Sequence, residues 1–148
     1  EVTNRLIKNF PKNIVGMKDS TGNLWDNFKA ENFSMFVGSE KQLLNSLKLG
    51  GAGCISATTN VIGSLAKKVY DDFHKSGNSS GNEKLKTLRT IFDDTGNLVA
   101  AVHTFKSLEN KVYENLLPPL ELLSDSKKKE MMKKLKDLNF LPNKNIAA

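Results

Sequence analysis

The sequence predicts an α/β protein built on a parallel sheet, and three observations support this class. Short segments that are apolar throughout occur at residues 14–17, 34–37 and 53–57. Segments with a helical spacing of apolar residues separate them. Strands of continuous apolar character are typical of parallel sheets whose two faces are both covered by helices. We therefore expect three strand–helix units in residues 1–76 and a helical C-terminal extension in residues 77–148.

The predicted elements of the first half follow one another with short connections. Gly50-Gly51 ends the second helix, because glycine is a common C-terminal helix stop. Leu65, Val69 and Phe73 share one face of the third helix. In chain order, the elements are strand 14–17, helix 23–30, strand 34–37, helix 40–49, strand 53–57 and helix 61–75.

The second half carries helical patterns. A flexible polar connection at residues 77–82 opens it. Pro118-Pro119 forms a rigid break before the last helix, whose start is marked by Ser124 and Asp125. The helices predicted here are 83–93, 97–116 and 126–138.

The composition is that of a globular protein with one modest core. The chain has 148 residues, of which 39% are hydrophobic and 26% charged. Cys54 is the single cysteine, so the chain has no intrachain disulfide framework and no cysteine cluster for a metal, and a reducing compartment fits. No apolar run is long enough to cross a bilayer, and the N-terminus lacks a signal-peptide pattern. We expect a cytoplasmic protein with no membrane partner.

The formal net charge of +6 raises the question of nucleic-acid binding. Much of the excess lies between residues 127 and 136, where lysines surround Met131 and Leu135 at helical spacing. This pattern predicts an amphipathic helix with a solvated lysine face, and no aromatic residues are interleaved to stack on bases. We therefore expect no nucleic-acid partner.

Residues suited to chemistry follow each predicted strand. Because the carboxyl ends of parallel strands meet at one edge of a sheet, functional groups collect there. The three candidate segments are residues 18–21, 38–40 and 55–58. We expect them to lie side by side.

Lys18 has two interpretations. Backed by Val15 and Met17, its amine would lose hydration, which favours the neutral nucleophile and Schiff-base formation with a ketone. Alternatively, Lys18 pairs with Asp19 or Glu40 in an ordinary ion pair. The spacing of the residues alone leaves both interpretations open.

The remaining candidates point to structure more than to chemistry. The glycine-rich segment 50–53 precedes a strand and does not open a helix, so it predicts a tight turn and not a phosphate site. Gly38-Ser39 stays open as an anion site ahead of the predicted helix 40–49. His74 and His103 have no partner pattern for nucleophilic catalysis, and we expect both to be structural.

Three segments resemble one known family. GMKDSTGN resembles the Schiff-base strand of the pyruvate-dependent class I aldolases, which include dihydrodipicolinate synthase and N-acetylneuraminate lyase. The following FVGSEKQLLNSLKLGGAGCISATTN is similar to that family's next two units, with the motif G-x-I-S-x-x-x-N. The closing LLPPLELLSDSKKKEMMKKLKDL resembles the family's Pro-Pro segment and final helix. The resemblance covers nearly the whole chain.

The resemblance implies the C-terminal portion of a (β/α)₈ TIM barrel, strands six to eight, followed by the helical extension. It implies that Lys18 is the catalytic, imine-forming lysine, that the backbone of Ile55 lies against bound pyruvate and that Gly38 lets the substrate approach. We expect Ser39 and Ala57 to be the other substrate-binding residues. The implied lyase joins pyruvate or another 2-oxo acid to an aldehyde, or cleaves the product, without a metal or an organic cofactor.

The resemblance is strongest to 4-hydroxy-tetrahydrodipicolinate synthase. The alternatives are a 2-keto-3-deoxy sugar-acid aldolase and N-acetylneuraminate lyase. In the sialic-acid-cleaving branch an acidic residue and a serine contact the sugar chain, and the matching positions here are Lys41 and Ala57. This difference argues against sialic acid as the substrate.

The chain departs from the family pattern in its acid/base group. The family's Thr-Thr pair and its proton-shuttling tyrosine belong to earlier strands, and Tyr70 and Tyr113 do not match that tyrosine. We therefore expect this chain alone to be poorly stable and nearly inactive, and the full-length protein to be a homo-oligomer. An alternative of another class is a non-catalytic half-barrel that serves as an interaction or remnant domain.

Overall fold

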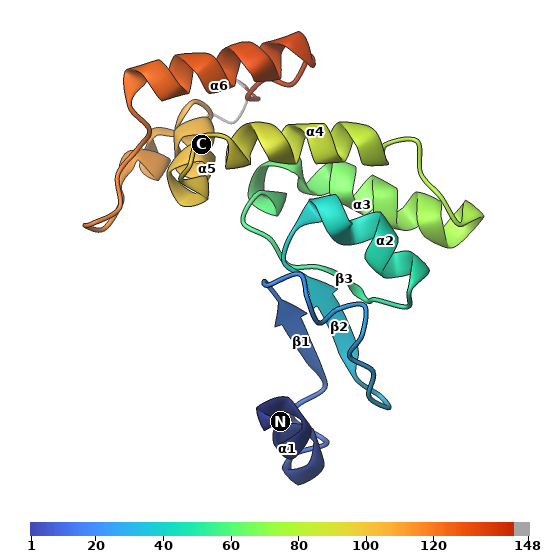
Figure 1. Cartoon of the computed structure of the whole chain (residues 1–148). Helices are drawn as coiled ribbons and strands as arrows, with labels where there is room; N and C mark the ends of the chain where they lie inside the picture. The colour runs from blue at the N-terminus through green and yellow to red at the C-terminus, as the bar shows by residue number, and fades with distance from the viewer. Residues whose placement is uncertain (144–148) are drawn as a thin grey trace. The chain divides into compact units, whose positions relative to one another are not determined.

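The computed structural model describes residues 1–143 (Figure 1). The first half of the described chain contains strands and helices, and the second half contains helices alone. In chain order the elements are α1 (Val2–Asn9), β1 (Gly16–Asp19), β2 (Ser34–Val37), the 3₁₀ helix η1 (Glu40–Gln42), α2 (Leu43–Lys48), β3 (Gly53–Cys54), α3 (Thr59–Ser76), α4 (Asn82–Asp93), α5 (Leu98–Ser107), the 3₁₀ helix η2 (Lys111–Glu114) and α6 (Asp125–Asp137).

The chain forms two compact units. The first comprises Glu1–Ser56 and Ala66–Asn82, and the second comprises Ala57–Leu65 and the chain from Glu83 onward. The backbone of α3 departs from helical geometry at Ile62 (φ −106°, ψ 17°). The predicted domains, 1–76 and 77–148, follow the sequence, whereas these units interleave at α3.

A parallel sheet in the strand order β1-β2-β3 is the centre of the first unit. β1 and β2 pair from Gly16 opposite Ser34 to Asp19 opposite Val37. α1 lies at the amino ends of the strands (Figure 1). The parallel pairing of strands that follow one another in sequence confirms the predicted α/β class.

One face of this sheet is buried against α2. Side chains alternate between the two faces of a strand, and Met35 and Val37 of β2 point to the same face, where both are buried. The apolar side of α2, which supplies Leu43, Leu44 and Leu47, is buried as well. The apolar spacing of residues 40–49 therefore predicted the covering helix correctly.

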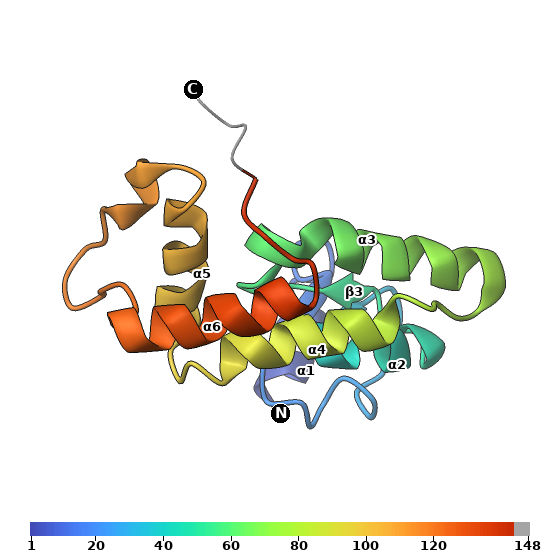
Figure 2. The same ribbon diagram turned by 90° about the horizontal axis from the view of Figure 1, so that it is seen from above.

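The second unit is a helical cluster. α6 lies alongside the C-terminal end of α4 (Figure 2), where the Lys127 ammonium donates to the Thr95 carbonyl oxygen at 2.7 Å. Phe92 of α4 and Phe105 of α5 pack edge to face with ring centroids 5.9 Å apart. The buried apolar core of the second unit includes Leu85, Leu88, Ile91, Phe92, Ala101, Phe105, Met131 and Leu135.

The predicted helix at residues 23–30 is wrong. The chain forms turns there, with one turn closed by a hydrogen bond from the Phe28 N–H to the Leu24 carbonyl at 2.7 Å. Phe28 then packs edge-on against Phe33, with ring centroids 5.6 Å apart. This aromatic contact joins the turn to Phe33, the residue that directly precedes β2.

The predicted helix at residues 97–116 is two helices. α5 ends at Ser107, and η2 begins at Lys111. The side chain of Asn110 accepts the Val112 N–H at 2.9 Å and caps η2. A side chain that binds nearby backbone in this way competes with continuation of a helix.

Two further features differ from the prediction, the length of the third strand and the presence of α1. The third strand pairs only over Gly53–Cys54, not over 53–57, because its last ladder hydrogen bond runs from the Ile55 N–H to the Val37 carbonyl. α1 was not predicted at all. It buries no residue, so its apolar spacing contributes little core.

Leu88→Ala should destabilise the protein by roughly 2–5 kcal/mol, because removing a fully buried leucine loses apolar burial and leaves a cavity. Leu117→Ala is the matched control, since Leu117 is 82% exposed, and it should change the free energy of unfolding by less than about 0.5 kcal/mol. Urea denaturation measures both values. Equal losses would contradict the core assigned here.

Candidate active site

The carboxyl ends of the three strands are joined by backbone hydrogen bonds. The Gly38 N–H donates to the Asp19 carbonyl oxygen at 2.8 Å, and the Ile55 N–H donates to the Val37 carbonyl oxygen at 3.0 Å. Three predicted site residues, Lys18, Gly38 and Ile55, are thereby brought to one edge of the sheet.

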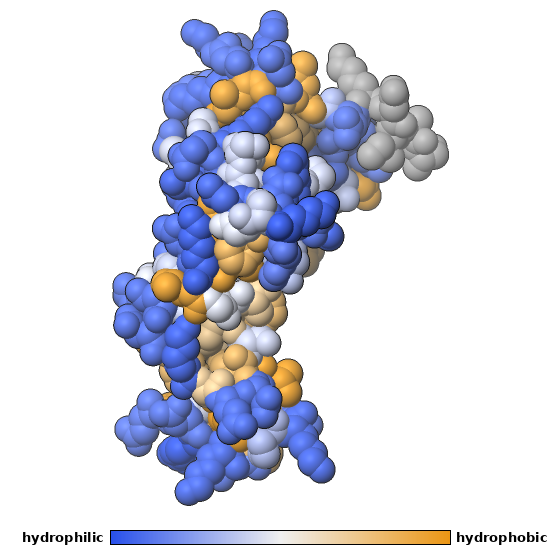
Figure 3. All heavy atoms as spheres, turned by 90° about the vertical axis from the view of Figure 1, so that its right-hand side faces the viewer, coloured by the Kyte–Doolittle hydropathy of each residue, from blue (hydrophilic) through white to orange (hydrophobic). Residues whose placement is uncertain are grey.

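Lys18 lies on the sheet face opposite to Met35 and Val37. It pairs in register with Phe36, which pairs with Gly53, so the side chains at these positions share one face. Ile55 continues this alternation two residues beyond Gly53 and is 50% exposed. We call this the open face. Figure 3, which views the molecule from the right-hand side of Figure 1, shows pale to orange residues at the level of the strands.

The Lys18 side chain is exposed, and among residues 1–143 it forms no ion pair or hydrogen bond. The ion pair with Asp19 or Glu40 is therefore not formed within the described chain. The expected shielding of the amine from water is not observed there either. The reason is that the covering helix α2 packs on the other face of the sheet.

Asp19, the neighbour of Lys18, points to the covered side and is 3% exposed. Its two carboxylate oxygens accept hydrogen bonds from the loop that follows β1, so one side chain fixes the path of residues 20–25. The donors are the Thr21 N–H (2.8 Å), the Thr21 hydroxyl (2.6 Å), the Gly22 N–H (3.3 Å), the Leu24 N–H (2.9 Å) and the Trp25 N–H (3.1 Å).

These contacts set the charge state of Asp19. Burial alone would raise the pKa of its carboxyl group, but the hydrogen bonds from the Thr21 hydroxyl and from the backbone N–H groups of Leu24, Thr21 and Trp25 outweigh it and lower the pKa to about 2. The carboxylate therefore stays ionised wherever the protein is folded at moderate pH.

Gly38 is required by the close approach of two strand ends. A Cβ atom at this position would lie 2.9 Å from the Ser20 Cα atom and 3.0 Å from the Asp19 carbonyl oxygen. Both are backbone atoms, so they cannot move aside without shifting β1. This packing reason stands beside the implied role of Gly38 in substrate approach, which stays a prediction.

Ser39 and Ala57 lie differently from the other predicted site residues. The Ser39 hydroxyl accepts the Lys41 N–H at 3.4 Å and caps η1. Ala57 belongs to the second unit, where its carbonyl accepts the side-chain amide of Asn60 at 2.9 Å. The predicted substrate contacts of Ser39 and Ala57 stay predictions.

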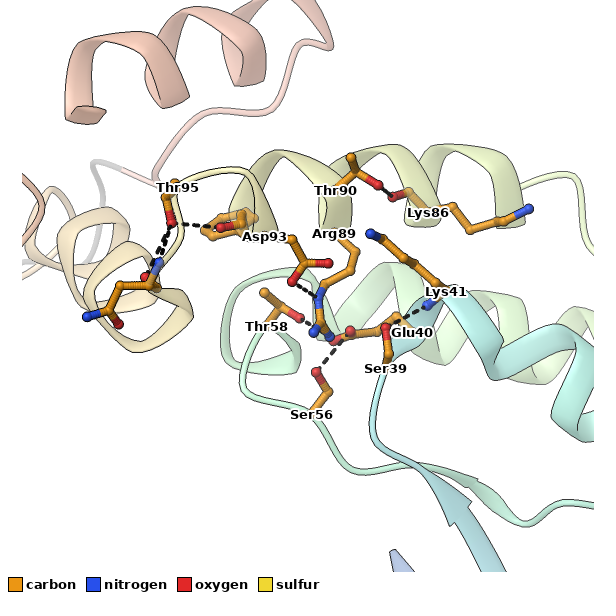
Figure 4. Close-up of polar contacts among 12 residues, drawn as sticks. Ser39, Glu40, Lys41, Ser56, Thr58, Lys86, Arg89, Thr90, Asp93 and Thr95 are labelled. Atoms are coloured by element: carbon orange, nitrogen blue, oxygen red, sulfur yellow. Dashed lines mark hydrogen bonds and ion pairs between the residues drawn. The ribbon is translucent and has the colours of Figure 1, made fainter. Parts of the chain in front are cut away.

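Sequence reasoning missed the pair formed by Glu40 and Ser56. Glu40 is fully buried, and its Oε2 atom accepts the Ser56 hydroxyl at 2.9 Å (Figure 4). Both residues follow strand ends, Glu40 after β2 and Ser56 after β3. An acidic residue two positions after Gly38, together with the serine of the G-x-I-S motif, was the signal that could have found this pair.

The second unit contains its own buried polar contacts. The Arg89 Nε atom donates to Asp93 at 2.8 Å, and the Arg89 Nη1 atom donates to the Thr58 hydroxyl at 3.4 Å (Figure 4). Arg89 and Thr58 are buried. The helical pattern of residues 83–93 gave no indication of this buried cation.

Residues 1–143 show neither a metal-binding cluster nor a membrane-spanning helix. They contain no group of three or more His, Cys, Asp or Glu side chains arranged to hold a metal ion. Within the same range, every helix is too short or too polar to cross a membrane.

Comparison with known proteins gives one consistent family. The Dihydrodipicolinate synthetase family matches residues 1–138. The 4-hydroxy-tetrahydrodipicolinate synthase of Buchnera aphidicola subsp. Cinara cedri is 29% identical over 143 residues, which are 90% of this chain and 48% of that protein.

Solved structures agree in fold. YagE from Escherichia coli, a member of the dihydrodipicolinic acid synthase family in complex with pyruvate, has a TM-score of 0.76 at 21% identity, over 94% of this chain and 50% of that one. Dihydrodipicolinate synthase from Cyanidioschyzon merolae with lysine bound has a TM-score of 0.74 at 21% identity, over 94% and 49%.

One part of the sequence-based identification has to be corrected to a coarser statement. The chain spans about half the length of the curated relatives it matches. The matches establish the family and the share of each relative that the chain covers. They do not support the predicted placement as strands six to eight in the C-terminal portion of a barrel, and that prediction is withdrawn. What holds is a parallel α/β fold like that of the family.

Asp19→Asn should destabilise the protein by roughly 2 kcal/mol at neutral pH, because the amide cannot accept all the donors of the loop. The folded-state pKa of about 2 lies below the ordinary pKa of an aspartate side chain, 3.8. The ionised carboxylate therefore stabilises the fold above pH 4, and this contribution is lost as the pH falls toward 2. Urea denaturation across this range measures the difference between variant and wild type, which should shrink on acidification.

The control for this series is Asp26→Asn in the same loop, where the exposed carboxylate accepts the side-chain amide of its neighbour Asn27 at 2.8 Å. Asp26→Asn should leave the stability and its pH dependence nearly unchanged. A wild-type protein whose stability advantage over Asp19→Asn persists at pH 2 would refute the assigned role.

Gly38→Ala should cost roughly 1–3 kcal/mol of stability, because its Cβ would overlap backbone atoms of the neighbouring strand end. Gly63→Ala is the matched control, since the nearest atom to its Cβ is the Thr59 Cβ at 3.9 Å within α3. Alanine in a helix should stabilise there by up to about 1 kcal/mol. Thermal melts compare the two, and similar effects would disprove the close approach.

Proposed function

Because this chain belongs to the dihydrodipicolinate synthetase family, we propose that Lys18 forms a Schiff base with pyruvate or a related 2-oxo acid. Members of this family are lyases of the class I aldolase type. The observation that carries the proposal is the position of Lys18. Its exposed amine lies on the open face, at the same strand edge as Gly38 and Ile55.

The chemistry follows from the amine. The neutral Lys18 nitrogen attacks the keto carbon of the 2-oxo acid, and the carbinolamine loses water to give a protonated imine. The imine is an electron sink, so a proton can leave the adjacent carbon to give an enamine. The enamine carbon adds to the carbonyl carbon of an aldehyde, and water then hydrolyses the new imine and releases the lysine. The cleavage reaction is the same sequence reversed.

The proposed reaction is most like that of 4-hydroxy-tetrahydrodipicolinate synthase. Relatives of that name match at 25–29% identity over nearly the whole chain. The complex of YagE with pyruvate supports a 2-oxo acid as one substrate. Cleavage of a 2-keto-3-deoxy sugar acid is the nearest alternative within the same chemistry, because both reactions begin with the Lys18 imine.

Three further properties belong to this proposal. The protein is cytoplasmic, its substrates are small molecules, and the full-length form associates with copies of itself. Tyr70 and Tyr113 lie in α3 and η2, so neither is assigned as the acid/base group, and the chain by itself should form the imine far better than it turns substrate over.

Incubation of the 148-residue chain with pyruvate and cyanoborohydride should add one pyruvate, less one oxygen atom, to Lys18, because hydride reduces the imine to a stable amine. Mass spectrometry of the intact chain and of its peptides measures the adduct. Lys18→Arg should abolish it, since the guanidinium stays protonated and is no nucleophile at neutral pH.

Lys48→Ala is the control, because Lys48 is an exposed lysine on α2 away from the strand edge. This variant should be labelled like the wild type. Circular dichroism checks that each protein is folded. A folded wild-type chain without an adduct, or with an adduct spread over its exposed lysines, would favour the non-catalytic half-barrel instead.

A further inference from the structure

β3 is the shortest strand of the sheet in the described chain. β3 pairs over only two residues, and its last ladder bond runs from the Ile55 N–H to the Val37 carbonyl. The next residue, Ser56, lies beyond this ladder. The family resemblance implies that the backbone of Ile55 lies against the bound 2-oxo acid. Ile55 is therefore at the end of the hydrogen-bond ladder that holds β3 in the sheet.

The Ser56 hydroxyl supplies a second attachment at this point. It donates to the carboxylate of Glu40 at 2.9 Å, and Glu40 has no exposed surface (Figure 4). Hydrogen bonds to a buried carboxylate are stronger and better defined than those between neutral groups in water. Glu40 in turn belongs to η1, two residues after Gly38. The bond therefore links the loops that leave β2 and β3.

The link is separate from the amine. Among residues 1–143, Lys18 forms no hydrogen bond or ion pair with Glu40 or Ser56. The Ser56 hydroxyl points to the buried Glu40 carboxylate, whereas the neighbouring Ile55 side chain is 50% exposed. Glu40 and Ser56 thus hold the Ile55 backbone through a buried contact that does not involve the amine.

We propose that Glu40 and Ser56 are positioning residues for the 2-oxo acid subsite, which act through the backbone of Ile55. This inference rests on the proposed Schiff-base function. The pair sets how tightly the keto acid is held next to Lys18 and leaves the reactivity of the amine unchanged. Loss of the bond should therefore weaken substrate binding without preventing imine formation at saturation.

The test measures cyanoborohydride labelling of the 148-residue chain against pyruvate concentration. Ser56→Ala should raise the pyruvate concentration for half-maximal labelling about tenfold, with the maximal extent of labelling unchanged. Ser56→Thr keeps the hydroxyl and should return the value to within about twofold of the wild type. Glu40→Gln keeps an acceptor oxygen without the charge and should fall between them.

Ser80→Ala is the matched control, because Ser80 is an exposed serine in the loop after α3, and it should behave like the wild type. Hydrogen exchange of the Ile55 amide gives a readout that needs no chemistry. It should be faster in Ser56→Ala than in the wild type and restored in Ser56→Thr.

The outcomes separate this inference from the proposed function. Wild-type labelling at Lys18 together with an unchanged half-saturation in Ser56→Ala would overturn the positioning role alone. So would a loss in Ser56→Ala that Ser56→Thr does not restore, or an unchanged exchange rate of the Ile55 amide. A folded wild-type chain that is never labelled would overturn the Schiff-base function and this inference with it.

Discussion

The carboxylate of Asp19 is the constraint on which the strand edge depends. It is almost wholly buried, yet it stays ionised because four backbone N–H groups and one hydroxyl converge on it. Residues 20–25 are consequently wrapped around the end of β1. This loop lies against Gly38, whose missing side chain lets β2 approach. Lys18 pairs with Phe36 of β2 and directly precedes Asp19, which fixes this loop.

The two faces of the sheet differ in how deeply their side chains are buried. Met35 and Val37 are buried on the side of α2, while Lys18 and Ile55 occupy the open face. Parallel sheets are normally covered on both faces. In the described chain α2 packs on one face only, and the Lys18 side chain on the other face is exposed. The chain spans about half the length of the curated relatives it matches.

The sequence predicted the parallel strands and most helices, because their apolar spacing reports burial directly. It failed where individual side-chain contacts accompany a change in the backbone path. Asn110 caps a new helix within residues 97–116, and the turns that replace the predicted helix 23–30 end beside the contact of Phe28 with Phe33. At the strand edge, Lys18, Gly38 and Ile55 were predictable from position. The link between Glu40 and Ser56 was missed, because it depends on side-chain orientations beyond the strand ends, which apolar spacing does not report.

The opposite orientations of Lys18 and Asp19 make β1 intolerant of any change in length. Adding or deleting one residue ahead of them would exchange the two faces. An ionised carboxylate would then be turned outward, and an ammonium group would replace it among amide hydrogens that repel a cation. We expect an inserted residue to be tolerated in the surface turn between Asp26 and Asn32, which carries no part of the strand register.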